Sequence, residues 1–215
     1  MKKIFFIVSF LTISSLSISA QVNAKSLEIL NKVSAEYQKS TSNIVNFQIT
    51  IKDVQKKTEN TVVGKIKTKQ NKINIVTSYA TIIFDGVSQY VYMPQTNEIN
   101  ISNPTKEDLA KLNPTYILNS YKKNYKINAP VVKTKNGVKA YSIDLFPESL
   151  KENYFKININ INGVTYEPTS IVTYSKDGSI HTIKILKIEK NATVNAADFQ
   201  FDAKKYPKAE IIDLR

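Results

Sequence analysis

The chain has 215 residues, of which 42% are hydrophobic and 22% charged, and its formal charge is +12. This length and apolar content suit one domain with its own core, and the few Gly (5) and Pro (7) exclude a collagen-like or disordered polymer. The sequence contains no Cys, which excludes disulfide scaffolds, thiol nucleophiles, and cysteinyl zinc or iron–sulfur sites.

The N-terminus has the layout of a secretory signal peptide. A lysine pair precedes an apolar run, broken by Ser and Thr, over residues 4–19, and the small residues Ala20 and Ala24 follow it. This layout predicts a signal peptide over residues 1–24, cleaved after Ala20 or after Ala24, ahead of a single domain over residues 25–215. A retained membrane anchor is disfavoured because the run is short for a spanning helix. We therefore expect an exported protein that is soluble after cleavage.

The positive charge comes almost entirely from lysine. The one arginine is Arg215, and removal of the leader's lysine pair leaves a charge of +10. Specific recognition of phosphates and bases favours the planar fork of arginine, whereas these lysines alternate with apolar residues as on a solvated sheet face. We expect no nucleic-acid partner.

The first element predicted after the leader is an amphipathic helix over residues 26–39. Leu27, Leu30, Val33 and Tyr37 recur there at helical spacing, with polar residues between them. Such a helix needs an apolar surface to pack against.

Beyond this helix the hydrophobic period changes to two, which predicts half-buried strands. The alternation is clearest around residues 47–52, 65–67, 73–75, 90–92, 99–101, 141–145, 155–161, 171–173 and 183–188. Positive-φ turns between antiparallel neighbours are expected at Asp85-Gly86, Asn136-Gly137, Asn162-Gly163 and Asp177-Gly178.

The alternation stops once, at residues 102–108, where a polar cap and early acids predict a short helix carrying Leu109 and Leu112. Asn113-Pro114 then predicts the start of a further helix. The chain is thus expected to be α+β and mainly antiparallel β, one large curved sheet with three short helices covering its apolar face. A tightly filled core and an incompletely closed barrel with helices capping a cavity both fit this pattern.

No constellation in the sequence predicts catalysis. His181 is the only histidine, and no serine lies on a Gly-flanked elbow to use it as a base. Asp144 and Glu148 fit solvated turn carboxylates better than an acid–base pair. No spacing of His, Asp and Glu predicts a metal site, and no Gly-rich loop predicts a phosphate cradle. We expect no enzyme, no catalytic residue, no metal and no cofactor.

Several segments carry a family resemblance. The Asp-Gly turn 84–86 and the segment Tyr90-Val91-Tyr92-Met93-Pro94 resemble an aromatic-x-Tyr-x-Pro stretch of the periplasmic outer-membrane lipoprotein carrier family, LolA. The turn at 177–181, the segment 194–201 and the ending 206–215 are similar to further family segments in the same order. The resemblance spans essentially the whole mature chain.

This resemblance implies an unclosed antiparallel β-barrel, a half barrel, with a lid of short helices. It also implies a periplasmic, monomeric carrier that takes triacylated lipoproteins from the inner-membrane ABC transporter LolCDE to the outer membrane, where a LolB-like acceptor is expected. A better-known branch of the family latches its lid with an arginine after the second strand. Here Lys69 and Lys72 are the candidate replacements, although lysine lacks the planar fork.

A carrier of this kind predicts an apolar cavity that binds acyl chains. The expected wall residues are Phe47, Ile49, Ile51, Ile73, Ile75, Phe84, Tyr90, Tyr92, Ile99, Ile157 and Ile159. The expected underside of the lid comprises Leu30, Leu109, Leu112, Ile117 and Leu118. The alternative function is an exported module that binds polyanions or surfaces through its lysine-rich strands.

Overall fold

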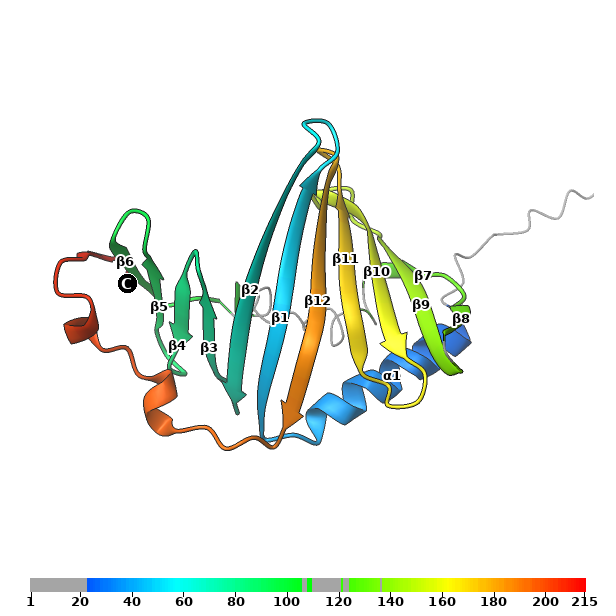
Figure 1. Ribbon diagram of the computed structural model, residues 1–215, viewed down its shortest axis with the longest axis horizontal. Helices are drawn as coiled ribbons and strands as arrows, with labels where there is room; N and C mark the ends of the chain where they lie inside the picture. Colours follow the sequence, from blue (N-terminus) through cyan, green and yellow to red (C-terminus); the bar gives the residue numbers. More distant parts are fainter. Residues whose placement is uncertain (1–22, 106–107, 110–120, 122–123, 136) are drawn as a thin grey trace, which may run out of the picture.

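One large, curved sheet forms the body of the molecule, and a long helix, α1, lies along part of one face (Figure 1). The structure, a computed structural model, describes residues 23–105, 108–109, 121, 124–135 and 137–215. In the described part of the chain the sheet has thirteen strands and does not close on itself. The expected mainly antiparallel, unclosed sheet is confirmed.

Helix α1 spans Ala24–Gln38, close to the predicted range. Asn23 caps its start, because the Asn23 side-chain oxygen accepts hydrogen bonds from the backbone N–H groups of Lys25 (3.1 Å) and Ser26 (3.2 Å). This cap satisfies two of the N–H groups that lack partners at a helix start. The Ser26 hydroxyl donates to the carbonyl of Asn128 at 2.6 Å, which ties the helix start to the chain beyond the seventh strand.

The strands are long in the middle of the sheet and short towards its ends. Their bounds are β1 Ser42–Asp53, β2 Thr58–Lys69, β3 Lys72–Thr77, β4 Thr81–Phe84, β5 Gln89–Met93, β6 Glu98–Ser102, β7 Tyr125–Ile127, β8 Val131–Lys135, β9 Val138–Pro147, β10 Tyr154–Asn162, β11 Pro168–Ser175, β12 Ser179–Lys190 and β13 Glu210–Asp213. Two short 3-10 helices, η1 (Ala196–Phe199) and η2 (Ala203–Lys205), precede β13.

The sheet order is β13-β6-β5-β4-β3-β2-β1-β12-β11-β10-β9-β7, and β8 also pairs with β9. Neighbours in this order pair antiparallel except β13, which lies parallel to β6. The β1–β12 pairing joins the two halves of the chain. A register shift between Asn46 and Phe47 in this pair leaves an extra residue on β12, and such bulges increase strand twist and bending.

One of the predicted turns differs from expectation. Gly86, Gly137 and Gly178 have positive φ, at 110°, 75° and 86°. Gly163 does not, and in its turn the positive φ (56°) falls on Tyr166. Gly163 is required for space, because a Cβ there would lie 2.6 Å from the carbonyl oxygen of Lys139. Here the glycine allows two backbones to approach, rather than a left-handed turn.

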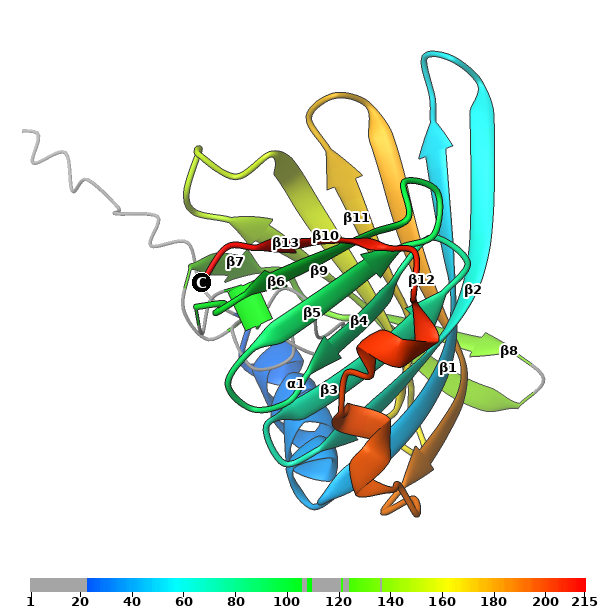
Figure 2. The ribbon, with the colours of Figure 1, turned by 90° about the vertical axis from the view of Figure 1, so that its left-hand side faces the viewer.

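The two faces of the sheet are covered by different parts of the chain. Figure 1 shows α1 beside β9–β11, and Figure 2 shows the two short helices η1 and η2 in front of β3–β5, on the opposite face. We call the face that α1 covers the inner face and the opposite one the outer face. Of the first predicted central helix, Ser102 instead ends β6, residues 103–105 are not helical, and Asp108 and Leu109 are helical. Residues 106–107, 110–120 and 122–123 lie outside the described residues.

Candidate hydrophobic binding site

The inner face is a continuous apolar surface that crosses both halves of the sheet. Register pairs Ile143 with Ile159, Ile159 with Ile171, Ile171 with Ile183, and Ile183 with Ile49, so one isoleucine row runs over β9, β10, β11, β12 and β1. Residues paired across antiparallel strands point to the same side, which places the whole row on one face.

The first half of this face, over β9–β11, is closed by α1. Ile29, Leu30 and Val33 of the helix have no more than 1% of their surface exposed, and Ile143 and Ile159 beneath them have none. We call this the helix-covered cluster. Its buried members are Ile29, Leu30, Val33, Tyr121, Ile127, Tyr141, Ile143, Leu145, Ile157, Ile159, Ile161 and Ile171.

The second half of the face, over β12 and β1–β4, is only partly covered. Its buried residues are Val45, Phe47, Ile66, Ile73, Ile75 and Phe84. Packed against them are further aliphatic side chains that keep part of their surface exposed: Ile49, Ile82, Leu109, Ile183, Ile185 and Ile188. We call this the open cluster. Partly exposed aliphatic side chains gathered in one concave place are what a site for apolar ligands requires.

A glycine shapes the floor of the open cluster. Phe47 on β1 lies opposite Gly64 on β2, and a Cβ added to Gly64 would come within 2.4 Å of the Phe47 ring. The same Cβ would be 2.9 Å from the Thr77 side chain. The missing side chain therefore lets the Phe47 ring lie flat over β2. Sequence reasoning gave this glycine no role, because its strand pattern predicts an ordinary residue there.

Most predicted wall residues lie on the inner face, although in different clusters. Phe47, Ile49, Ile73, Ile75 and Phe84 belong to the open cluster. Ile157 and Ile159 belong instead to the helix-covered cluster, as does Leu30, which was expected under the lid. Ile51 continues the inner face beyond Ile49 but is 41% exposed. Leu109 contacts the open cluster, while Leu112, Ile117 and Leu118 lie outside the described residues.

The prediction was wrong for Tyr90, Tyr92 and Ile99. The β4–β5 hairpin pairs Phe84 with Gln89, so Tyr90 lies beside Ile83 and faces away from Phe84. Tyr92 pairs with Ile99 on this same outer face. The alternation was read correctly in each strand, but the turn length decides which alternate set faces inward.

On the outer face these residues pack under the C-terminal segment. Tyr90 stacks on Phe201 with ring centroids 4.8 Å apart, and Phe201 stacks on Tyr206 at 5.7 Å. Tyr206 in turn lies 4.1 Å from Tyr92. Stacked rings bury large areas and hold a defined geometry, so this segment is fastened to the sheet.

An ion pair fixes the beginning of the same segment. Lys67 of β2 lies 2.6 Å from the carboxylate of Asp198, and the Asn74 side chain donates to the Asp198 carbonyl. The Lys67 hydrogen bond is the main reason why the pKa of Asp198 is lowered. The outer face at β2–β6 is therefore occupied by the chain itself.

The two candidate latch lysines are not placed to hold a lid over the inner face. Lys69 and Lys72 pair with each other across the β2–β3 turn, at positions whose side chains belong to the outer face. Neither ammonium group has a hydrogen bond or ion pair with a residue in the described part of the chain. The expected latch at these positions is not supported.

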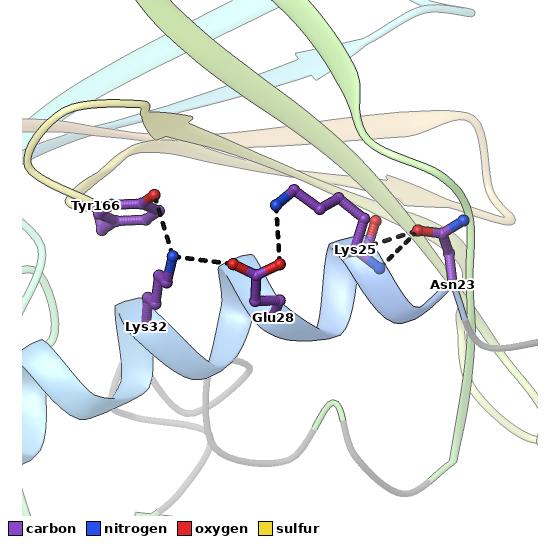
Figure 3. A network of polar contacts seen from close by, with 6 residues as sticks. Asn23, Lys25, Glu28, Lys32 and Tyr166 are labelled. Carbon is purple, nitrogen blue, oxygen red and sulfur yellow. Dashed lines mark hydrogen bonds and ion pairs between the residues drawn. The ribbon is translucent and has the colours of Figure 1, made fainter.

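Polar contacts hold α1 from its solvent side (Figure 3). The Glu28 carboxylate accepts from Lys25 at 2.8 Å and from Lys32 at 2.9 Å, and the Lys32 ammonium also lies 3.5 Å from the Tyr166 hydroxyl in the β10–β11 turn. These lysine hydrogen bonds, Lys25 first, lower the pKa of Glu28 to about 2. The exposed network adds little stability by itself but orients the helix on the strands.

A shallow groove of about 480 Å³ lies beside this network, between α1 and the β10–β11 turn. Its walls include Lys32, Glu36, Lys39, Val164 and Tyr166. Charged side chains supply much of the lining, and no buried member of either inner-face cluster is among the lining residues. It is not a site for long hydrocarbon chains.

Some residues of the open cluster were missed by sequence reasoning. Val45, Ile66, Ile82, Ile183, Ile185 and Ile188 all lie in predicted or adjoining strand patterns but were not among the expected wall residues. The available signal was the pairing of β1 with β12, which brings residues 45–49 beside residues 183–188. This pairing joins strands that are far apart in sequence, so local alternation does not reveal it.

Neither a metal site nor a membrane helix is found in the described ranges. Among residues 23–105, 108–109, 121, 124–135 and 137–215, no three His, Asp or Glu side chains gather as metal ligands would. Over the same residues, no helix is long and apolar enough to cross a bilayer.

Comparison with known proteins gives a family match. The sequence profile of the family described as "Outer membrane lipoprotein carrier protein LolA" matches residues 16–178. No curated protein sequence matches the chain.

Solved structures that are similar to the chain were also found. An uncharacterized conserved protein from Thermus thermophilus has a TM-score of 0.56 and 13% identity, over 88% of this chain and 99% of that one. The lipoprotein LppX from Mycobacterium tuberculosis has a TM-score of 0.48 and 13% identity, over 81% and 100%. A putative outer membrane lipoprotein-sorting protein domain from Vibrio parahaemolyticus has a TM-score of 0.46 and 14% identity, over 82% and 97%. At 13% identity, the likeness to the Thermus thermophilus protein concerns the fold alone.

Proposed function

Because the chain belongs to the outer membrane lipoprotein carrier (LolA) family, we propose that it binds the acyl chains of lipoproteins on its inner face and carries them between membranes. The observation that supports this most directly is the open cluster, whose aliphatic side chains stay partly exposed although α1 closes the neighbouring strands. The work is transfer, and no reaction chemistry is proposed.

The energetics of acyl chains require such a surface. Burying hydrocarbon is worth roughly 0.8 kcal/mol per CH₂, so several chains in water would cost tens of kcal/mol. A carrier must also release its cargo, so its site has to bind less well than the destination. Half-covered aliphatic walls make fewer contacts than a close-packed core, which limits the affinity.

The proposed route follows the family. The carrier receives triacylated lipoproteins from the inner-membrane transporter LolCDE and delivers them to the outer membrane, to a LolB-like acceptor where one exists. It acts in the periplasm, as a monomer, after removal of its leader. No nucleic acid takes part.

The helix cap favours one of the two predicted cleavage sites. Cleavage after Ala24 would remove Asn23, and with it the side chain that caps α1 and the backbone N–H that donates to Ile127 at 3.1 Å. Loss of an Asn cap costs about 1 kcal/mol of helix stability. We therefore propose cleavage after Ala20. The intact mass of the exported protein tests this, since a mature chain beginning at Lys25 would contradict it.

Acyl binding is tested with a fluorescent fatty-acid probe and the purified mature protein. Ile183→Asp places a charge in the open cluster and should abolish saturable probe binding, because a carboxylate there repels hydrocarbon. Val63→Asp is the matched control, since Val63 lies on the outer face and is 62% exposed. The control should bind the probe like the parent.

A second assay addresses carriage. The parent protein should release newly made lipoproteins from spheroplasts, and Ile183→Asp should not. If the parent binds no probe and releases no lipoprotein, the proposal fails. Binding of polyanions with steep salt dependence, without any response to acyl chains, would support the alternative function instead.

A further inference from the structure

The inner face changes from aliphatic to polar at one end of the open cluster. Beyond the Ile49–Ile183 pair, the next inner-face row pairs Ile51 with His181, and His181 with Thr173 of β11. One row further, Asp53 pairs with Ser179. These rows lie towards the tips of the β1–β2 and β11–β12 hairpins, at the top of Figure 1. A ligand whose tail lies on the open cluster would place its head here.

The hydrogen bonds of this polar end fix the ring of His181. The carboxylate oxygen of Asp177 accepts from the backbone N–H of Ser179 at 2.8 Å and from its hydroxyl at 2.7 Å. The Ser179 hydroxyl oxygen lies 3.0 Å from Nε2 of His181. These Ser179 hydrogen bonds, the hydroxyl first, lower the pKa of Asp177, so the group is an ionised acceptor.

The order of donors and acceptors follows from that carboxylate. An ionised carboxylate only accepts, so the Ser179 hydroxyl gives its proton to Asp177. Its oxygen is then available to accept from His181, which places the imidazole proton on Nε2. In the neutral ring Nδ1 consequently carries a lone pair and accepts hydrogen bonds.

A second carboxylate adds to the accepting character. Asp53 accepts from the backbone N–H groups of Lys56 at 2.9 Å and Gln55 at 3.0 Å, and its other oxygen lies 3.2 Å from the Lys56 ammonium. Those bonds, the Lys56 backbone first, lower the pKa of Asp53. The Lys56 side chain is 80% exposed, so solvent screens its charge.

We infer that Asp53, Asp177, Ser179 and His181, together the inner rim, select the head group of the bound lipid. The rim accepts a hydrogen bond at Nδ1 of His181 from a neutral donor, an amide N–H or a hydroxyl, and disfavours carboxylate heads. This rests on the proposed function, since it assigns the head of a ligand whose tail occupies the open cluster. An acylated polypeptide presents amide N–H groups next to its tails, whereas a free fatty acid presents an anion.

The test compares three amphiphiles with the same tail: dodecanamide, methyl dodecanoate and dodecanoate. Each is titrated against the fluorescent fatty-acid probe bound to the mature protein. Dodecanamide should displace the probe about fivefold more tightly than the methyl ester, the size of one net hydrogen bond, and dodecanoate should be the weakest. Equal affinities, or a preference for dodecanoate, would overturn the inference.

Variants locate the effect. His181→Leu should bind amide and ester equally, while Thr182→Val, the neighbouring outer-face position, should keep the parent's ratio. Ser179→Ala should also lower the ratio of amide affinity to ester affinity, because the imidazole is then free to present an N–H to the ester. This variant provides the test if His181→Leu does not fold. An unchanged ratio in both variants would refute a role for the rim. If the probe itself does not bind the parent protein, the proposed function fails. If the probe binds and no amphiphile displaces it, the inference about the rim fails.

Discussion

The two halves of the inner face are built alike but finished differently. Both present isoleucines from long antiparallel strands, and the two meet where Ile171 pairs with Ile183. Ile171 is 5% exposed under α1, while Ile183 keeps part of its surface exposed. Among the described residues, Leu109 is the one side chain from outside the sheet that packs on the open cluster. Cover, rather than composition, separates the closed core from the open apolar surface in this sheet.

Equal truncations in the two halves should show this difference most clearly. Ile159→Ala removes a side chain with no exposed surface and should lower the free energy of unfolding by about 2–5 kcal/mol. Ile183→Ala removes a partly exposed one and should cost only about 1 kcal/mol, because solvent already reaches it. Urea denaturation of both variants measures the two losses.

Probe binding should show the reverse order for the same pair. Ile183→Ala should weaken the fluorescent fatty acid, and Ile159→Ala should leave its affinity unchanged while the protein stays folded. If the two variants lost equal stability and equal probe affinity, the two halves of the inner face would not differ in the way described.

The floor of the open half gives the next largest expected effect. Gly64→Ala should lower stability by about 1–3 kcal/mol, because the new Cβ would displace the Phe47 ring. The smaller side chain of Phe47→Leu should relieve the clash, so the double variant should recover most of the loss. Thermal melting of the single and double variants measures this coupling. Simple additivity of the two changes would show that the ring does not depend on the glycine.

Much of this architecture was predictable because strand alternation is local. The amphipathic helix and the inner positions of β1 and β3 follow directly from periods of 3.6 and 2. The face of β5 did not, because a hairpin loop of residues 85–88 sets Gln89 rather than Tyr90 opposite Phe84. That count is fixed by turn geometry, which propensities describe poorly.

The other gap is non-local. Pairing between β1 and β12, and the return of the C-terminal segment onto the outer face, join residues far apart in sequence. The aromatic residues Phe201 and Tyr206 were the visible signal for this return, since a solvated tail has no need of them. Single-sequence alternation cannot say which face they meet.

A smaller effect is expected from the outer face. Phe201→Ala removes the ring that lies between Tyr90 and Tyr206, and should cost about 1 kcal/mol or slightly more from lost stacking and burial. Acyl binding should not change, because the open cluster is on the opposite face. Urea denaturation and probe titration separate the two. Loss of probe binding in a stable variant would place the tyrosines back in the binding site and undo the assignment of faces.

The smallest expected effect concerns the Glu28 network that holds α1 on the strands. The pKa of Glu28 is about 2 in the folded protein, below the 4.5 of a free carboxyl, so its support of α1 is present above pH 4.5 and is lost as the pH falls towards 2. Glu28→Gln removes this carboxylate and should flatten the acid dependence of stability in that window only slightly, since the Glu28 side chain is 47% exposed and solvent screens its charge. Melting curves between pH 2 and 6 measure the change, and Glu189→Gln, a partly exposed carboxylate that pairs with Lys187 outside α1, is the control. Acid should loosen the helix-covered half and leave probe affinity for the open half unchanged. A fall in probe affinity at low pH that is seen in the parent and is absent in Glu28→Gln would instead show that α1 also affects the open cluster.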